Sequence, residues 1–391
     1  MTANDDNIGR LGDEPTCAIM YLSDGAGPQA KIVGAQRDNV IAAGERFLAA
    51  SGGDACLLLA GPLVSEAGRD DQSTEGAVAR CCTARFGYPG DPFDGTIDLI
   101  LDTFGGSLDS AFKTMLFLSR FAKRLRVFVP RHAKSAGTLI AVGANELYMS
   151  PFAELGPLDT QIRDPRNPTD RVSALDCYQS VDYVRAFGLT TLSRAFRALA
   201  AETRTLIPLP QLVNTSADFS IGSIAPILTQ VNALDFGGWG RTLRIGEKYA
   251  QTLLSRVDYG EEESRDLAHQ LVYGYTHHPF PIDMNEARRI GLKPFAMTEE
   301  QYQSALDIVT ACAEPGAIVV GFADDKSGQP AGPGTRGPDG FLSERAARGV
   351  AHARAGDVAG DGSPGPVAWI EEGERPARAA RDKAVDDGDP D

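Results

Sequence analysis

Two turns near the middle of the chain carry the residue types that acyl-transfer chemistry uses. Ser135 stands at the start of a predicted helix, and the small residues Ala136 and Gly137 leave room for a substrate carbonyl. A serine in this place can attack a carbonyl carbon, while an amide of its own helix start stabilises the oxyanion. The earlier turn holds Gly105 and Gly106, whose lack of a Cβ lets the backbone approach a ligand. Together the turns predict a serine nucleophile with backbone oxyanion donors.

Each turn also has a plainer interpretation. A serine that precedes a helix is most often an N-cap, and a lone Gly-Gly pair is usually only a turn. The two turns are separated by one strand–helix unit, and that repetition favours a site over two unrelated turns.

The elements around the turns predict a parallel sheet. Strands are expected at 97–102, 125–130 and 146–149, and helices at 108–124 and 135–144. Strand–helix–strand alternation is typical of parallel strands joined by crossover helices. Both turns follow the carboxyl ends of strands, which is where α/β folds form their sites.

Composition divides the chain into three parts. Residues 1–15 are polar and acidic, and we expect them to be flexible. Residues 16–315 form the predicted peptidase domain, with a strand at 56–60, a loop at 62–95 and a mostly helical part after residue 178. Residues 324–391 contain 12 Gly and 7 Pro in 68 positions, and few large apolar residues. This composition predicts a disordered, acidic tail.

Charge and cysteine usage exclude several classes of protein. The net charge of −15 argues against a nucleic-acid partner, which would reward an excess of Lys and Arg. The sequence lacks an apolar run of membrane-spanning length and a secretory signal, so we expect a cytoplasmic protein without an integral membrane segment. The six cysteines show no zinc-ligand spacing, so we expect reduced thiols and neither a metal nor a cofactor.

Three segments resemble the serine dehydrogenase proteinase family of the Clp protease/crotonase superfamily, which is related to signal peptide peptidase A. They are DTFGGSLDSA, FVPRHAKSAGTLIAVGANELYMSPFAELGPLDTQI and THHPFPIDMNEARRIGL. The S-A-G-T-L-I-A block with L-G-P-L-D-T-Q carries most of the specificity. The matches span about residues 97–292. Phe104 departs from the family, which usually has Pro there, and the membrane segment of many relatives is missing.

The resemblance implies an α/β fold, a Clp/crotonase-like spiral of βαβ units with a helical C-terminal part. It implies Ser135 as nucleophile, oxyanion amides from Gly105 or Gly106 and from Ala136, and a homo-oligomer. The function it implies is hydrolysis of peptide or protein substrates through an acyl-enzyme. The sequence identifies no unfoldase partner.

The general base is the least determined part of the site. Clp-type proteases place a His about where this chain has Asp159, and the Lys of signal peptide peptidase A has no counterpart here. His278 is our preferred base, because it lies in a family-like segment and imidazole titrates near neutral pH. Asp159 would then orient the imidazole. His132, Lys134 and Lys248 are the alternatives.

Two other functions fit the same fold. An acyl-CoA hydratase or isomerase also uses paired oxyanion amides, but it needs a groove for CoA and no serine nucleophile. A catalytically inactive scaffold or peptide-binding ring protein would need neither. The sequence shows no basic cluster for the CoA phosphates, and we therefore expect a serine peptidase.

Overall fold

A computed structural model describes residues 19–21, 35–65, 73–89, 92–164, 167–203, 206–313 and 317–324. The chain divides into two units, residues 1–329 and 330–391, and the second lies outside the described residues. The predicted flexible N-terminus, 1–15, and the predicted tail beyond Asp324 also lie outside them. The description below concerns the first unit.

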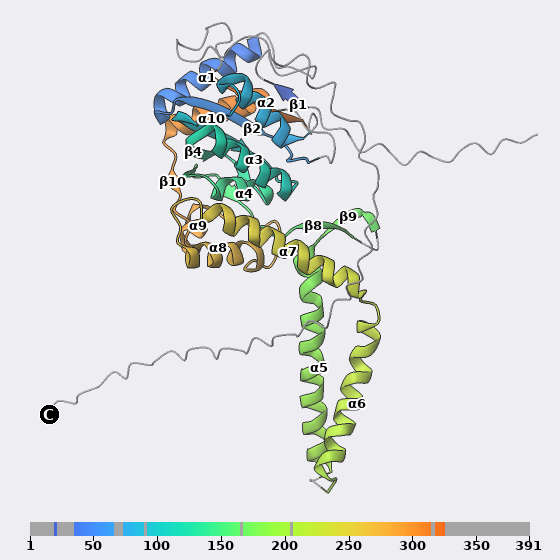
Figure 1. Ribbon diagram of the computed structural model, residues 1–391. Coiled ribbons are helices and arrows are strands. Elements are labelled where there is room, and N and C mark those ends of the chain that lie inside the picture. Colours follow the sequence, from blue (N-terminus) through green and yellow to red (C-terminus); the bar gives the residue numbers. More distant parts are fainter. Residues whose placement is uncertain are drawn as a thin grey trace, which may run out of the picture. The chain divides into compact units, whose positions relative to one another are not determined.

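A seven-stranded sheet forms the centre of the fold (Figure 1). Its order is β1(Ile19–Tyr21), β11(Ile318–Phe322), β2(Ala55–Ala60), β3(Phe93–Asp102), β4(Ala122–Val129), β6(Glu146–Met149) and β10(Phe295–Ala296). Strands from β2 to β10 run parallel to their neighbours, and β11 is antiparallel to β2. The helices α2(Thr74–Phe86), α3(Leu108–Phe121) and α4(Ala136–Val142) connect the parallel strands. This arrangement confirms the predicted α/β fold of βαβ units.

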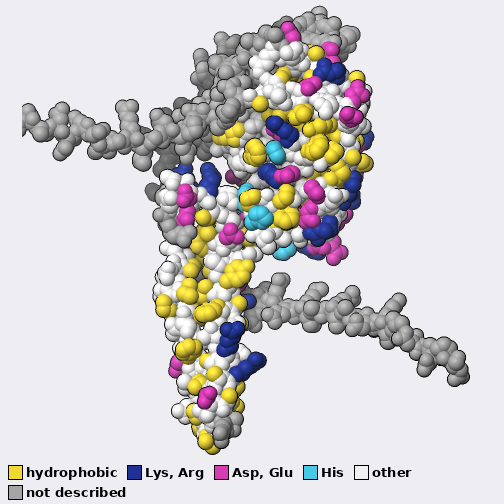
Figure 2. Space-filling view, turned by 180° about the vertical axis from the view of Figure 1, so that it is seen from behind, with side chains coloured by type: hydrophobic (Ala, Val, Ile, Leu, Met, Phe, Trp, Pro, Cys, Tyr) yellow, Lys and Arg dark blue, Asp and Glu magenta, His cyan; other side chains and the backbone are white. Residues whose placement is uncertain are grey.

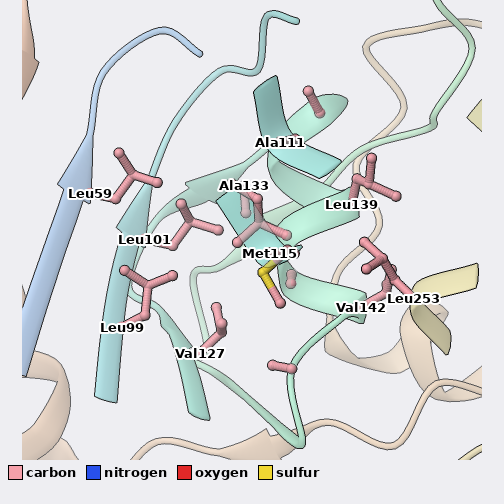
Figure 3. Packing of buried hydrophobic residues seen from close by; sticks show 14 of the residues in the cluster. Leu59, Leu99, Leu101, Ala111, Met115, Val127, Ala133, Leu139, Val142 and Leu253 are labelled. Carbon is pink, nitrogen blue, oxygen red and sulfur yellow. The ribbon is translucent and has the colours of Figure 1, made fainter. Parts of the chain in front are cut away.

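Alternate residues of each central strand face two different hydrophobic clusters. Leu57 and Leu59 of β2 pack in the cluster with α2, α3 and α4, whereas Cys56 and Leu58 pack in the cluster with α1(Ala35–Ser51) and α10(Glu299–Cys312). This alternation follows from the two-residue period of a strand. Figure 3 shows the first cluster around Met115 of α3. Because both faces are covered, the carboxyl halves of β3 and β4 are mostly apolar, as is β2, which made them readable in the sequence.

Two small sheets lie beyond the carboxyl edge of the central strands. β5(His132–Ala133) pairs with β7(Glu154–Leu155), and β8(Gln161–Asp164) forms an antiparallel hairpin with β9(Asn167–Ser173). The bridge between Thr103 and Ala133 connects the end of β3 with β5. Through it the two predicted functional turns become neighbours.

The C-terminal part is helical, as predicted. It contains α5(Ala174–Glu202), α6(Leu209–Leu228), α7(Ala233–Leu254), α8(Glu261–Tyr273) and α9(Met284–Ile290). α5 and α6 lie side by side as a helical hairpin (Figure 1). In the described part of the chain, no helix is both long and apolar enough to cross a membrane.

Three elements differ from the sequence prediction. α2 occupies a segment expected to be a loop, and α6 was not expected because Pro, Asn, Ser and Gly interrupt its pattern. β11 lies beyond residue 315, where the predicted domain ends, yet it belongs to the central sheet. Asp324, assigned to the tail, accepts a hydrogen bond from the Cys56 amide at 3.1 Å. The short apolar run of β11 was hidden by the Gly/Pro-rich sequence after it.

Candidate active site

The backbone at Ser135 has a conformation that favours glycine. Its φ is +50° and its ψ is −118°, and among the described residues it is the one non-glycine with positive φ. The Gly137 amide donates to the Lys134 carbonyl at 2.8 Å, closing a tight turn. These angles are those of the first central residue of a type II′ turn, where glycine is usual. The turn therefore holds Ser135 in a strained conformation of the kind that clusters at functional sites.

The side chain of Ser135 does not cap its helix. No side-chain cap hydrogen bond forms at the start of α4, although Ser135 occupies the N-cap position. The residue is largely buried and borders a cleft of about 1120 Å³. Within the described residues its hydroxyl makes no hydrogen bond. The structure thus contradicts the N-cap interpretation.

The Gly-Gly turn lies directly against Ser135. Both glycines have positive φ, +100° at Gly105 and +141° at Gly106. A Cβ on Gly105 would stand 2.9 Å from the Ser135 Cβ and 2.8 Å from the Lys134 carbonyl oxygen. Only glycine permits this approach without a shift of the backbone. The close contact explains why the earlier turn needs a glycine at this position.

The two glycines differ in whether their amides are free. The Gly105 amide donates to Thr103 Oγ1 at 3.0 Å. The Leu63 amide donates to the Gly105 carbonyl, and the Ser107 amide donates to the Leu63 carbonyl. These bonds flank Gly106, whose own amide has no acceptor among the described residues. The Ala136 amide begins α4 and so has no intrahelical acceptor. Gly106 and Ala136 therefore carry the amides that are available to an oxyanion. The Gly105 amide is not available, because it is bonded to Thr103.

His278 and Asp159 form a hydrogen-bonded pair. His278 Nδ1 lies 2.9 Å from Asp159 Oδ1, with the Asp159 side chain 3% exposed and that of His278 24% exposed. Asp159 Oδ2 accepts a second hydrogen bond, at 2.6 Å, from Ser173 Oγ. Because Nδ1 is engaged, Nε2 is the ring nitrogen left to exchange a proton. The structure brings together the two residues that sequence reasoning selected as base and orienting acid.

Backbone hydrogen bonds fasten both residues near the nucleophile. Residues 154–158, which lead to Asp159, are called the strap here. Leu155 in the strap and Ile282 exchange two of these bonds, at 2.9 and 3.1 Å, and so connect the strap to the segment after His278. Thr138 Oγ1 in α4 contacts the Ala133 carbonyl and both the amide and the carbonyl of Gly156. The helix that follows Ser135 thus carries the strap that leads to Asp159.

Ser135, Gly105, Gly106 and His278 all border the same cleft. Ser135 Oγ and the His278 imidazole are not hydrogen-bonded to each other. Such contacts are often long in free enzymes and tighten when substrate binds. The arrangement supplies a hydroxyl, an imidazole paired with a carboxylate and the free Gly106 amide around one open space. These are components of acyl transfer to serine, and the Ala136 amide directly follows the hydroxyl in the chain.

The three alternative bases have other surroundings. Lys134 Nζ pairs with Glu154 at 2.6 Å and donates to the Leu155 carbonyl at 3.2 Å. His132 stacks on Phe104, with ring centroids 4.8 Å apart, and Lys248 is exposed on α7. None of the three borders the cleft. Their positions favour His278.

Arginine and cysteine side chains also reach the cleft. Arg131 forms a two-point ion pair with Asp102, at 2.7 and 3.2 Å, and hydrogen bonding to this carboxylate raises the pKa of Arg131. Arg171 of β9 is exposed there. Burial raises the pKa of Cys312 to about 12, so its thiol is a poor nucleophile at neutral pH. The described residues include no group of His, Cys, Asp and Glu that could hold a metal ion.

Sequence reasoning missed two polar residues of the site. Thr103 selects which glycine amide is free, and Ser173 contacts Asp159 from the start of α5. Threonine after a strand and serine before a helix are both common, so neither carried a signal by type or spacing. Their importance depends on tertiary contacts.

Comparison with protein families agrees with the motifs. Residues 89–180 match the family model described as ClpP-like SDH-type serine proteinase. This match confirms the resemblance that the sequence indicated, and it supports a serine peptidase. The matched segment contains Ser135, both glycines and Asp159, whereas His278 lies outside it.

Known proteins similar to this chain include two uncharacterized proteins of Methanocaldococcus jannaschii. MJ0137 is 26% identical over 217 residues, which is 56% of this chain and 59% of that protein. MJ1495 is 23% identical over 202 residues, covering 52% of this chain and 53% of that protein. The chain thus spans little more than half the length of these curated relatives.

Solved structures with some similarity are proteases. Two are mutants of the 1510-N membrane-bound stomatin-specific protease, one of them in complex with a substrate peptide. Both are 13% identical, with TM-scores of 0.34 and 0.33, and cover 63% and 62% of this chain and 81% and 75% of theirs. A ClpP1 mutant from Listeria monocytogenes is 14% identical, with a TM-score of 0.22, and covers 26% of this chain and 54% of its own.

Proposed function

We propose that the protein is a serine peptidase that hydrolyses peptide bonds through an acyl-enzyme on Ser135. One observation carries the proposal. A strained serine whose hydroxyl makes no hydrogen bond among the described residues borders the same cleft as the free Gly106 amide and His278, which is paired with the buried Asp159. The family match over residues 89–180 supports the same class of enzyme.

The proposed reaction assigns one role to each group. Ser135 Oγ attacks the scissile carbonyl while His278 Nε2 takes its proton, and Asp159 stabilises the imidazolium that forms. The amides of Gly106 and Ala136 donate to the oxyanion of the tetrahedral intermediate. His278 then returns the proton to the leaving amine. A water molecule, activated by the same imidazole, hydrolyses the acyl-enzyme and regenerates Ser135.

The cleft has few positive charges for the phosphates of an acyl-CoA substrate, which argues against the hydratase or isomerase alternative. The diphosphate and 3′-phosphate of CoA call for several unpaired cations. Of the described residues that border the cleft, Arg131 is already paired with Asp102, and Arg171 is the other arginine. An inactive scaffold would not need a serine in a strained backbone conformation, which is a feature typical of functional sites. These observations favour a peptide or protein substrate.

Hydrolysis of casein and of a fluorogenic peptide tests the proposal. We expect the parent protein to cleave them and Ser135→Ala to lose at least about 10³-fold in kcat. An acyl-CoA thioester supplied to the same protein is expected to stay unchanged. A Ser135→Ala protein that cleaves peptides at the parent rate would refute the assignment, and thioester turnover would favour the hydratase or isomerase.

We further propose a cytoplasmic homo-oligomer. The buried cysteines Cys56, Cys82 and Cys312 are free thiols, as in proteins of reducing compartments. Apolar side chains are exposed over the α5–α6 hairpin, and Figure 2 shows them on its outer surface. They include Tyr183, Phe187, Leu189, Phe219 and Ile221. A second copy of the chain would cover such a surface.

A further inference from the structure

The buried hydroxyl of Ser173 contacts both Asp159, the proposed orienting carboxylate, and the start of α5. Ser173 ends β9 and is the N-cap of α5. Its Oγ accepts hydrogen bonds from the Leu175 and Asp176 amides, at 3.1 and 3.3 Å. The same atom donates to Asp159 Oδ2 at 2.6 Å. Ser173 is 5% exposed, so solvent cannot readily replace these partners.

The hydrogen-bonding capacity of this hydroxyl is fully used. A serine hydroxyl has one proton to donate and two lone pairs that accept. The two helix amides take the lone pairs, which leaves the proton directed at Asp159. A short donor–acceptor distance is typical of a hydroxyl bound to a carboxylate. The two amides at the start of α5 therefore fix the direction in which the Ser173 hydroxyl donates its hydrogen bond to Asp159.

The bond from Ser173 fixes the plane of the Asp159 carboxylate relative to His278. With Oδ2 held by the hydroxyl, Oδ1 is the atom that meets His278 Nδ1 at 2.9 Å. Rotation of the carboxylate would break both contacts in a buried place, where unpaired polar groups are costly. The orientation of the imidazole thus depends on a group that does not touch it.

We propose that Ser173 is a positioning residue, which orients the Asp159 carboxylate toward His278 and so couples the α5–α6 hairpin to catalysis. The inference rests on the proposed function. It predicts that the hydroxyl affects the chemical step rather than substrate binding. A mere N-cap would affect only the stability of α5.

A second double N-cap provides the matched control. Asn232 Oδ1 accepts from the Leu234 and Asp235 amides at the start of α7, at 2.8 and 3.4 Å. It has the same capping geometry and is exposed, and among the described residues no bond to a carboxylate accompanies the cap. Asn232→Gly removes a capping side chain alone, whereas Ser173→Gly removes the cap and the donor. Glycine is well tolerated at N-caps, so both variants are expected to fold.

Three variants of Ser173 separate donation from capping. Ser173→Gly is expected to lower kcat on the order of 10²-fold, the size of a small misplacement of a catalytic group, with KM within about twofold. Ser173→Asp keeps a capping oxygen but places a second carboxylate against Asp159, so that the two share a proton and Asp159 loses negative charge. It should lose at least as much. Ser173→Thr keeps both functions and is expected to retain kcat within about threefold of the parent.

Nuclear magnetic resonance supplies a readout that does not depend on turnover. The Nδ1–H proton of His278, bonded to Asp159, should give a downfield resonance in the resting parent. We expect Ser173→Gly and Ser173→Asp to shift or broaden it, and Ser173→Thr and Asn232→Gly to leave it in place. Circular dichroism identifies any variant that fails to fold. If Ser173→Gly does, kcat is compared between Ser173→Thr and Ser173→Asp, which both retain the cap.

Two results would overturn the inference. One is a kcat and a downfield resonance in Ser173→Gly equal to those of the parent. The other is an equal loss of kcat in Ser173→Gly and Asn232→Gly, with Ser173→Asp fully active. Neither result would affect the proposed peptidase, which fails only if the parent protein does not hydrolyse peptides through Ser135.

Discussion

At the scale of residues, the strain at Ser135 separates function from stability. Its positive φ costs about 1–3 kcal/mol in a residue with a Cβ, and glycine avoids that cost. Ser135→Gly and Ser135→Ala both remove the hydroxyl, so we expect both to be inactive. Only Ser135→Gly relieves the strain.

The two variants should therefore differ in their free energy of unfolding. We expect Ser135→Gly to be more stable than Ser135→Ala by about 1 kcal/mol, measured by denaturant unfolding of the folded, inactive proteins. If the alanine variant were equally stable or more stable, the turn would not be strained as described.

The buried thiol at the cleft predicts a distinctive pH dependence. Burial raises the pKa of Cys312 to about 12, above the ordinary value of 9.0. Alkylation requires the thiolate, so Cys312 should react with iodoacetamide far more slowly at pH 8 than the same cysteine in denatured protein. Its rate should rise as the pH approaches 12.

Peptide mass spectrometry can follow Cys312 separately from the more exposed Cys177. We expect peptidase activity to survive treatment at pH 8. Rapid alkylation of Cys312 with parallel loss of activity would instead point to cysteine chemistry in the cleft.

Residue types and a family-like pattern sufficed to select Ser135, His278 and Asp159. The choice between Gly105 and Gly106 stayed open in the sequence, because it depends on which amide Thr103 engages. Ser173 escaped notice for the same reason. A contact made between distant segments leaves no mark in local spacing.

At the scale of elements, Thr138 connects the nucleophile helix to the strap that carries Asp159. Its hydroxyl is completely buried and lies 2.7 Å from the Ala133 and Gly156 carbonyl oxygens, and it accepts from the Gly156 amide at 2.9 Å. Thr138→Val keeps the shape and leaves these groups unpaired. The expected loss of stability is about 1–3 kcal/mol.

Thr138→Ser retains the hydroxyl and serves as the control, with stability expected within about 1 kcal/mol of the parent. Thermal and denaturant unfolding of the three proteins provide the measurement. A valine variant as stable as the parent would show that the strap is held by other contacts.

Strands and helices were easier to predict from the sequence where their residues are buried. β3 and β4 each end in a mostly buried, mostly apolar run, and every second residue of β6 is buried. The bounds of these strands were found within a few residues. α6 was missed because Pro, Asn, Ser and Gly interrupt its apolar residues, several of which remain exposed on the hairpin. β11 was missed because its partner β2 lies far away in the sequence.

At the scale of the whole molecule, the α5–α6 hairpin predicts self-association. The side chains of Phe219 and Ile221 are 61% and 59% exposed on a helix whose one charged residue is Asp218. Contiguous exposed apolar surface of this kind typically marks an interface. Phe219→Glu with Ile221→Glu should shift the protein toward monomers.

Sedimentation velocity measures this shift, and Tyr88→Glu is the control because Tyr88 is 90% exposed outside the hairpin. We expect Tyr88→Glu to keep the parent's assembly. A monomeric parent, or an assembly unaffected by the hairpin substitutions, would contradict the proposed homo-oligomer.

The most direct test of the central claim is covalent labelling of the nucleophile. A fluorophosphonate reacts with a serine that an adjacent base activates. We expect one adduct per chain, located on Ser135 by peptide mass spectrometry, with loss of peptidase activity in proportion to labelling. Ser135→Ala should not be labelled, and His278→Ala should be labelled at a small fraction of the parent rate. An unlabelled parent, or an adduct on another residue while Ser135→Ala still hydrolyses peptides, would contradict the account.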